Sequence, residues 1–339
     1  MDPISQGVLG ATFPLSFFRR GNFFPVMFVG AISGMAADLD IFIRSSVDPI
    51  FFLEFHRQFT HSLIFIPIGS FLVALSLYYF MRRHLSWWEL YIVCFLGYST
   101  HAVLDACTTY GTQLFWPFSN ERIAWNNISV VDPLFTLPII LFLMCAYLKH
   151  SRVFVFLGLG WVIFYISIGF LQRERALTLG HDIALSRGHS AGALLVKPSI
   201  GNLILWKIVY DFEGFYYVDA IRLTTDVQHC PGQSIAKLDL NKHLKHLKKN
   251  SQQAQDIEKF RKFSANYLSF DPAMNLIMDT RYSLLPNEIS PLWGIVVNPH
   301  EDAKKHVKWW ENRVPTKAQR AKFIALLRGG ACQIFLSSD

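Results

Sequence analysis

The sequence predicts a polytopic α-helical membrane domain of about five to six helices, followed by a small soluble α+β domain. Of the 339 residues, 52% are hydrophobic and only 17% are charged, whereas soluble domains average about 25% charged residues. The charge is also uneven, because residues 1–171 contain 18 of the 57 Asp, Glu, Lys and Arg residues and are net neutral, while residues 172–339 carry the whole net charge of +7. This composition argues against a disordered chain and against an ordinary cytosolic enzyme.

Six apolar segments define the membrane domain, which we expect at residues 1–171. A spanning helix needs about 20 mostly apolar residues, and the segments that approach this length are 4–18, 22–42, 62–80, 90–105, 131–148 and 153–171. The first segment is the shortest, so it either spans the bilayer or lies re-entrant. The chain begins Met1-Asp2-Pro3 without a basic region, and we therefore expect no cleavable signal peptide.

Short basic connections predict the orientation of these helices. The connections Arg19-Arg20, Arg82-Arg83-His84 and Lys149-His150-Ser151-Arg152 fall on one side of six spans, and cytoplasmic loops are enriched in Lys and Arg. The N-terminus, the loops at 38–61 and 105–132, and everything after residue 171 then lie on the outer side.

The predicted soluble domain covers residues 176–339. Its expected strands are 203–210 and 214–223, joined by the turn Asp211-Phe212-Glu213-Gly214, and further strands at 274–283 and 293–297. Its expected helices are 240–249, 252–268 and 316–327. Cys230 and Cys332 are the only cysteines in this polar half. They would pair in an oxidising compartment, but the sequence provides no geometry and leaves the pairing open.

A lysine-rich segment at 237–249 bears on possible partners. It contains five lysines, with Leu240, Leu244 and Leu247 at helical spacing. We interpret it as a solvated amphipathic helix, and weak contact with anionic lipid headgroups is the second interpretation. Nucleic acid is not an expected partner, because the domain is predicted to face outward.

The polar residues of the membrane half collect at one predicted membrane face. Asp38 and Asp40 end one apolar segment, His56 and His61 precede the next, and His101 and Asp105 close a third. The i,i+4 spacing of His101 and Asp105 places both on one helical face. Three histidines and three carboxylates suit Zn²⁺, Mn²⁺ or Fe²⁺ better than Ca²⁺ or Mg²⁺. We therefore predict a divalent metal site, with zinc as the first choice.

Each of these residues also has a structural interpretation. A His–Asp pair at i,i+4 is often an ordinary hydrogen bond, and either Asp38 or Asp40 would serve equally well as a loop cap. Ionisable groups in spanning segments are costly, however, and usually functional, which favours the metal site. Arg57 and Arg122 lie close in sequence to these groups and would bind a phosphate or carboxylate, or else extend to lipid headgroups.

These motifs together resemble the YdjM-like family of inner-membrane proteins, most strongly over residues 1–135. The matching pieces are Asp2-Pro3-Ile4-Ser5-Gln6-Gly7-Val8-Leu9-Gly10-Ala11, Ala37-Asp38-Leu39-Asp40, His56-Arg57-Gln58-Phe59-Thr60-His61-Ser62, His101-Ala102-Val103-Leu104-Asp105, Thr108-Thr109-Tyr110-Gly111-Thr112-Gln113-Leu114 and Pro117-Phe118-Ser119. The resemblance implies a bacterial inner membrane protein, a divalent metal at the His and Asp motifs, and metal-dependent hydrolysis. Many members carry His where Gln6 stands, which leaves the number of ligands open.

The sequence thus favours a membrane-bound metal-dependent hydrolase at the outer face of the inner membrane, with its C-terminal domain periplasmic. A metal-activated water would attack a lipid or lipid-linked phosphoester. The expected metal ligands are His56, His61, His101 and Asp105, supported by Asp38 and Asp40. Asp38 or Asp40 would alternatively act as general base, and Arg57 and Arg122 would hold the anionic group of the substrate.

Two other classes of protein stay open. A transporter also needs polar residues in its helix bundle, although it usually holds them near the membrane midplane rather than at helix ends. A metal-stapled scaffold or partner-binding protein without turnover is the other alternative. The sequence does not identify a protein partner or an oligomeric state.

Overall fold

The computed structural model describes residues 1–18, 23–330 and 332–334, and the chain divides into two compact units. The helical unit comprises Met1–Ile43, Phe55–Leu171 and Ile200–Asn202, and the sheet unit comprises Arg44–Glu54, Gln172–Ser199 and Leu203–Asp339. A helical N-terminal region is thus followed by a sheet-rich C-terminal domain, as the sequence predicts. Arg19 and Arg20, which contribute to the predicted orientation, lie outside the described residues.

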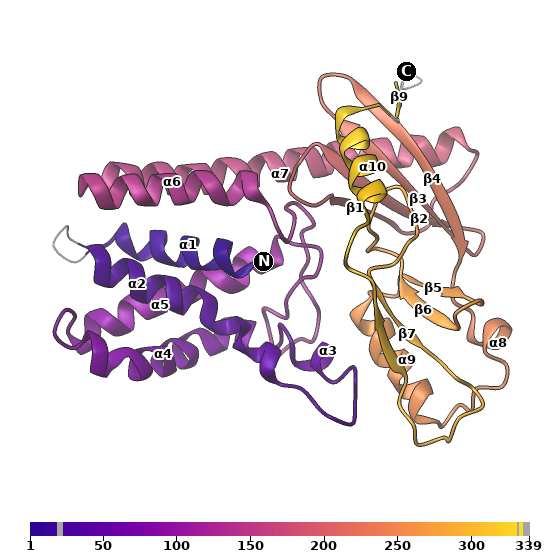
Figure 1. Ribbon diagram of the computed structural model, residues 1–339, viewed down its shortest axis with the longest axis horizontal. Helices are drawn as coiled ribbons and strands as arrows, with labels where there is room; N and C mark the ends of the chain where they lie inside the picture. Colours follow the sequence, from indigo (N-terminus) through magenta and orange to yellow (C-terminus); the bar gives the residue numbers. More distant parts are fainter. Residues whose placement is uncertain (19–22, 331, 335–339) are drawn as a thin grey trace. The chain divides into compact units, whose positions relative to one another are not determined.

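The helical unit is built from long apolar helices (Figure 1). These are α1 (Pro3–Leu15), α2 (Phe23–Met35) with the 3-10 helix η2 (Ala36–Phe42), α4 (Ile66–Met81), α5 (Trp87–Ala106), α6 (Pro133–Lys149) and the first part of α7 (Arg152–Ser186). Among the described residues, Phe23–Phe42, Leu63–Met81 and Arg152–Ser186 are long and apolar enough to cross a membrane, and α6 is a shorter apolar helix. The larger count of five to six spans stays a prediction.

Polar side chains fix where these helices begin. The Asp2 side chain accepts hydrogen bonds from the backbone N–H groups of Ile4 and Ser5 and so caps α1. Ser86 and Glu89 form a capping box at the start of α5. Asp132 caps α6 in the same way as Asp2 caps α1.

Glycines allow α1, α2 and α5 to approach closely. A Cβ atom added at Gly10 would lie 2.6 Å from the Gly30 carbonyl oxygen, and one added at Gly34 would lie 2.6 Å from the Gln6 carbonyl oxygen. At Gly97 of α5, an added Cβ would lie 2.7 Å from the Gly30 oxygen. Small residues at such crossings let helix backbones touch. The crossing therefore brings distant parts of the sequence together: Gln6 and His101, which are 95 positions apart, are in hydrogen-bond contact.

The sheet unit contains two antiparallel sheets (Figure 1). The first has the order β1-β2-β3-β4-β9 and the second the order β5-β6-β7-β8. The strands are β1 (Leu194–Pro198), β2 (Leu205–Phe212), β3 (Phe215–Leu223), β4 (Val227–Ala236), β5 (Leu268–Asp271), β6 (Leu276–Asp279), β7 (Trp293–Val296), β8 (Lys308–Glu311) and β9 (Gln333–Ile334). The helices are α8 (Leu240–His243), α9 (Gln252–Phe263) and α10 (Lys317–Arg328), and a four-residue helix, α3 (Phe52–Phe55), joins the two units along the chain.

Two predicted helices of the sheet unit are shorter than expected. The lysine-rich helix at 240–249 ends at His243, because Leu244 leaves helical geometry and is the only buried leucine of the three. A short helix needs a packed apolar face, and the next residues are mostly exposed lysines. The helix expected at 252–268 ends at Phe263, since Ala265 and Asn266 take positive φ angles before β5 begins.

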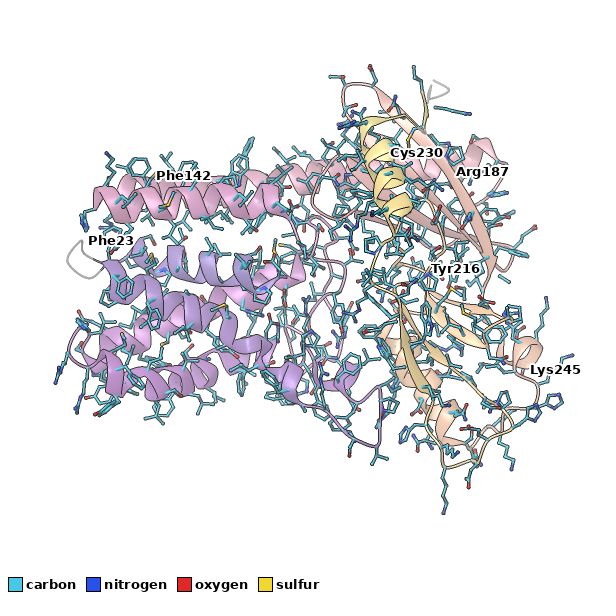
Figure 2. The ribbon with its side chains drawn as sticks, in the orientation of Figure 1. Phe23, Phe142, Arg187, Tyr216, Cys230 and Lys245 are labelled. Atoms are coloured by element: carbon cyan, nitrogen blue, oxygen red, sulfur yellow. A yellow bond between two sulfur atoms is a disulfide. The ribbon has the colours of Figure 1, made fainter. Side chains whose placement is uncertain are left out.

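A disulfide joins Cys230 of β4 to Cys332, which directly precedes β9. Cys230 is labelled in Figure 2 within the sheet unit. The two cysteines are 102 residues apart in sequence. The pairing that the sequence left open is therefore present in the structure.

Candidate metal centre

The helical unit gathers the predicted ligands from three separate elements. Asp38 and Asp40 lie on η2, and His61 ends the 3-10 helix η3 (Phe59–His61). His101 and Asp105 lie on successive turns of α5. The side chains of His61, His101 and Asp105 are fully buried, whereas the Asp38 side chain is 22% exposed.

Four ligand atoms converge on one point. The His61 Nε2 and His101 Nε2 atoms are 2.9 Å apart. Asp38 Oδ1 lies 3.6 Å from the first and 3.4 Å from the second, and Asp105 Oδ2 lies 3.2 Å from the first and 3.6 Å from the second. A tetrahedral zinc ion with bonds of about 2.0–2.1 Å separates its ligand atoms by about 3.3–3.4 Å. The four residues therefore fit a divalent cation of this size.

The hydrogen bonds of the two imidazoles determine where their lone pairs point. His101 Nδ1 lies 2.6 Å from the Gly34 carbonyl oxygen. That oxygen only accepts, so Nδ1 carries the hydrogen and Nε2 of the neutral ring presents a lone pair. His61 Nδ1 faces Thr60 Oγ1 at 2.9 Å, and this hydroxyl donates its own hydrogen to Asp40.

The His61 Nε2 atom is consequently also a lone-pair atom. Two lone pairs at 2.9 Å repel each other unless a cation lies between them. A shared proton or a metal ion satisfies this requirement, and a metal ion would also be within reach of the carboxylate oxygens of Asp38 and Asp105.

Asp40 and His56 form a second set beside the first. The Asp40, Asp38 and His56 ligand atoms lie within 4.8 Å of one another. Asp40 Oδ1 is 2.7 Å from His56 Nδ1, and Asp40 Oδ2 accepts hydrogen bonds from the Arg57 backbone N–H and the Thr60 hydroxyl. Asp40 also lies 3.3 Å from His61 Nδ1, so it orients the His61 ring from the side opposite Nε2.

Burial keeps the His56 ring in a state that suits metal binding. It lowers the pKa of His56, although the Asp40 hydrogen bond acts in the opposite direction. The neutral imidazole is the form that binds metal ions.

The two predicted substrate-binding arginines have different surroundings. Arg57 is 4% exposed, and its Nε lies 3.1 Å from Asp105 Oδ2. Its guanidinium also lies over the Tyr110 ring, 4.7 Å from the centroid. Arg122 donates to the His56 carbonyl oxygen at 2.8 Å and lies 5.6 Å from the same ring. Arg57 thus balances the charge of a ligand, and Arg122 supports the loop that carries His56.

Gln6 is a member of the site that ligand spacing alone does not reveal. Its Nε2 donates to Asp105 Oδ1 at 3.0 Å, and its Oε1 is buried without a hydrogen-bond partner among the described residues. The Met1 amino nitrogen also contacts Asp105. A glutamine within an apolar helix was the available signal, since the amide needs polar neighbours when it is buried.

A further His–Asp group in the sheet unit is already saturated. Asp256 accepts from the His306 ring at 3.0 Å and from the Val307 backbone N–H at 3.0 Å. Lys259 lies 3.1 Å from the neighbouring carboxylate of Asp48. Cations and donors therefore already fill this group, and we interpret it as structural.

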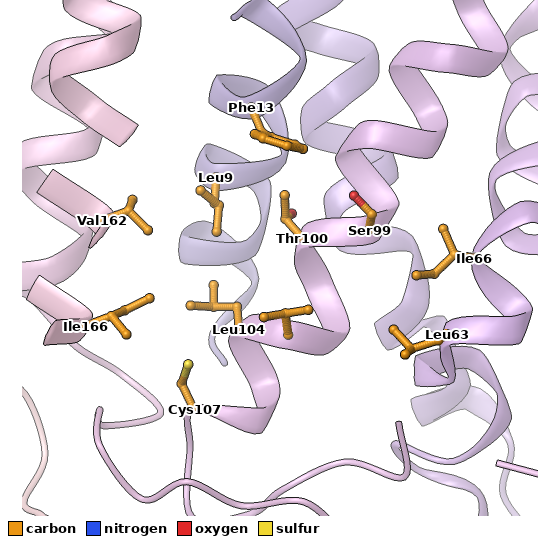
Figure 3. Close-up of a pocket in the computed structure, with 11 residues that line it drawn as sticks. Leu9, Phe13, Leu63, Ile66, Ser99, Thr100, Leu104, Cys107, Val162 and Ile166 are labelled. Carbon is orange, nitrogen blue, oxygen red and sulfur yellow. The ribbon is translucent and has the colours of Figure 1, made fainter. Parts of the chain in front are cut away.

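An apolar pocket of about 440 Å³ lies in the helical unit (Figure 3). It extends along Leu9 and Phe13 of α1 and past Leu104 of α5 and the C-cap residue Cys107 toward α7. Leu104 and Cys107 flank Asp105 in sequence, and Leu9 lies one turn beyond Gln6 on α1. The pocket thus uses the same turns of α1 and α5 that carry polar residues of the site.

Comparison with known proteins identifies relatives of the helical unit. The model of a family described as YdjM inner membrane protein matches residues 1–176, just over half of the chain. The chain is also 27% identical over 198 residues to "Uncharacterized protein YfhP" of Bacillus subtilis (strain 168). That alignment covers 57% of this chain and 58% of the relative, so the chain matches less than two thirds of its length. No solved structure matches. The six predicted metal ligands all lie within residues 1–176.

Proposed function

Because the chain belongs to the YdjM inner membrane protein family, we propose that it is a metal-dependent hydrolase of the inner membrane. One observation carries this proposal: two imidazole lone pairs face each other at 2.9 Å between two carboxylates. The residues proposed to hold a divalent cation, zinc first and manganese or iron as alternatives, are Asp38, His61, His101 and Asp105, with His56 and Asp40 beside them. Such a cation would lower the pKa of a water molecule and so supply a nucleophile near neutral pH.

The protein groups around the cation would have distinct roles. Asp38 is the most exposed of the four ligands, so the open side of the site lies next to it, where it is also the best candidate for a general base. Asp40 orients His61, and Arg57 holds Asp105 in place. Arg122, at the His56 loop, is the better candidate to bind an anionic group of the substrate.

A lipid or lipid-linked phosphoester is the proposed substrate class. The apolar pocket supports it, because an acyl or prenyl chain lying along Leu9 and Phe13 would begin one turn from Gln6. Gln6 in turn contacts Asp105. A headgroup at the polar cluster and a chain in the pocket would then fit a single amphipathic molecule.

We further propose a multi-pass topology with the sheet unit in the periplasm. The basic connections after α4 and α6 support this orientation. The Cys230–Cys332 disulfide supports it independently, since disulfides persist in oxidising compartments such as the periplasm.

Elemental analysis of the full chain in detergent tests the metal centre. Wild-type protein is compared with His101→Ala/Asp105→Ala, and with His84→Ala as a control that removes an exposed imidazole from the loop after α4. We expect about one or two equivalents of Zn, Mn or Fe in the wild type and the control, and less than about a tenth of that in the double variant. Equal, negligible metal in all three folded proteins would overturn the proposal.

A metal-stapled scaffold is the second candidate, because four protein ligands with little exposure also describe a closed structural site. The Co²⁺-substituted protein separates the two candidates. Azide or phosphate changes the visible spectrum of an open site by binding to the metal, but leaves a closed site unchanged. An unchanged spectrum, together with no hydrolysis of phosphoesters, would favour the scaffold.

A further inference from the structure

A second reactive group lies in the sheet unit, outside the part of the chain that the family model matches. Lys207 of β2 is 2% exposed, and its Nζ lies 2.7 Å from the Ser283 hydroxyl oxygen and 3.1 Å from the Glu288 carbonyl oxygen. We propose that Ser283 and Lys207 form a nucleophile–base dyad that cleaves carboxylic esters. Serine activated by an adjacent lysine is a recurrent arrangement in acyl transfer.

The surroundings of Lys207 disfavour its ammonium form. Lys197 of β1 is its direct cross-strand partner, and like charges in that position repel. The described residues include no carboxylate in an ion pair with either lysine. The nearby Asp279 is bonded to Arg281 at 2.7 Å, and the Glu288 carboxylate is bonded to Lys322.

Burial and neighbouring charges lower the pKa of both lysines. Burial lowers the pKa of Lys207 well below its usual value, and the positive charge of Lys197 lowers it further, against the nearby Asp279 and Glu288. Burial, with Arg281, brings the pKa of Lys197 to about 7. In the structure Lys207 Nζ donates to Ser283 Oγ, whose own hydrogen is donated to the Leu285 carbonyl oxygen at 2.6 Å. An uncharged Lys207 has a lone pair that would accept this hydrogen after rotation of the hydroxyl.

Ser283 is placed where a substrate can reach it. It begins a loop held by a bridge to Pro291, and residues 283, 284 and 288–293 all keep partial exposure. Lys207 is held from the other side by the Glu288 carbonyl, so the base is oriented by a third group. A nucleophile, a base and an orienting group are the parts that this chemistry requires.

The proposed reaction is an acyl transfer through an acyl–serine ester. Ser283 Oγ forms a bond to the ester carbonyl carbon while its proton moves to Lys207 Nζ. The bond from that carbon to the leaving alkoxy oxygen then breaks, and the lysine returns the proton to the departing alcohol. Water hydrolyses the acyl–serine ester by the same proton transfers and releases a carboxylic acid. The step requires no metal, so it is independent of the proposed metal centre.

A fluorophosphonate probe tests the dyad on the full chain in detergent. We expect a single covalent adduct on Ser283, found by peptide mass spectrometry and unchanged by EDTA. Ser283→Ala should lose it, while Ser290→Ala, which removes a neighbouring half-buried hydroxyl, should keep it. A hydrolysable ester, p-nitrophenyl butyrate, should be cleaved by the same variants that are labelled.

Lys207→Arg separates catalysis from structure. Arginine retains the positive charge and the hydrogen-bond donors that a purely structural role would need, but it cannot act as a base near neutral pH. We expect the rate of labelling to fall by about 100-fold or more in protein that keeps the Cys230–Cys332 disulfide and a cooperative thermal transition. Lys207→Met provides the same readout if the arginine does not fit. No labelling of Ser283 in folded wild-type protein, or equal labelling in Lys207→Arg, would overturn the proposal.

Discussion

Two buried ion pairs of the sheet unit and the candidate metal centre of the helical unit have opposite arrangements of charge. In the sheet unit, the carboxylate of Asp279 receives two guanidinium hydrogens of Arg281, and that of Asp219 receives two from Arg187. In the helical unit, His61, His101 and the two carboxylates beside them direct acceptor atoms toward one another. In the first case each carboxylate faces guanidinium donors. In the second, two imidazole lone pairs face each other beside two carboxylates, although Arg57 and Gln6 also contact Asp105.

The difference shows that burial of a charged group does not by itself indicate function. A buried ion pair that is fully hydrogen-bonded is a neutral structural unit, costly to break but needing nothing more. A buried group whose imidazole lone pairs converge still needs a proton or a metal ion between them. The inventory of donors and acceptors therefore distinguishes a structural site from a candidate binding site.

The largest expected effect comes from opening a saturated pair in the sheet unit. Arg281→Met leaves Asp279 buried without its cation, which should cost about 3–5 kcal/mol of unfolding free energy. Hydrogen exchange at β5 and β6 would measure the loss, and the metal content should not change. Arg281→Met/Asp279→Leu should recover most of the stability. If the double variant is as unstable as the single variant, the pair stabilises the unit through its hydrogen bonds and packing, and not only by neutralising charge.

The disulfide links two parts of the same unit covalently. Its removal should cause the next largest decrease in the free energy of unfolding. Cys230→Ser/Cys332→Ser should lower the unfolding free energy by about 2–5 kcal/mol, measured by thermal unfolding in detergent. Cys145→Ser, which removes an unpaired thiol, is the matched control. Alkylation of protein taken from cells without reduction should leave Cys230 unmodified. Modification of Cys230 in those cells would argue against a periplasmic sheet unit.

Acid should weaken the sheet unit through Asp219. Burial raises the pKa of Asp219, but hydrogen bonds from His229 and Arg187 outweigh this and bring it to about 2. Because the folded value lies below the unfolded value of about 3.9, the stabilisation is complete above pH 4 and is lost as the pH falls toward 2. It amounts to about 2 kcal/mol.

Asp219→Asn tests this origin of the acid sensitivity. The variant should be less stable than wild type at pH 6, and the difference should shrink between pH 4 and pH 2 in urea unfolding monitored by hydrogen exchange at β3. A difference that stays constant over this range would assign the stabilisation to packing rather than to charge.

The smallest effect should come from Asp40, the supporting carboxylate of the candidate metal centre. Asp40→Asn keeps the size of the side chain but weakens its hold on His61, so metal affinity should fall by about tenfold, or roughly 1.4 kcal/mol. Competition with a chromophoric chelator measures the change, and Asp48→Asn in the sheet unit is the matched control. An affinity equal to that of the wild type would mean that Asp40 only caps the loop.

Much of the site follows from local sequence patterns, and the rest depends on helix crossings. The i,i+4 rule correctly brings His101 and Asp105 together, at 3.6 Å. The sequence does not predict that Asp38, rather than Asp40, lies with His61, His101 and Asp105, since the directions of the two side chains depend on the turns of η2. Arg57 takes a positive φ of 63° and pairs with Asp105, which no spacing rule predicts.

The placement of Gln6 shows the same limit. It reaches the site because glycines allow α1 to touch α2 and α5, and a single sequence does not show which helices cross. In the sheet unit, the long strands β2 and β3 follow from turn chemistry between them. The end of α8 at His243 cannot be predicted from the sequence, because it depends on which of the three leucines is buried in the folded unit.

The segment Arg44–Glu54 has a consequence for the metal centre that follows from chain connectivity alone. It belongs to the sheet unit, where Ile50 is fully buried and Phe52 packs edge-on against Trp309 at 5.2 Å. Asp40 lies shortly before this segment in the sequence, and His56 lies shortly after it. A released segment would be a flexible loop of 11 residues, and closing such a loop costs conformational entropy. By holding the segment, the sheet unit keeps Asp40 and His56 close to each other, so unfolding of the sheet unit should also weaken cation binding at the candidate metal centre.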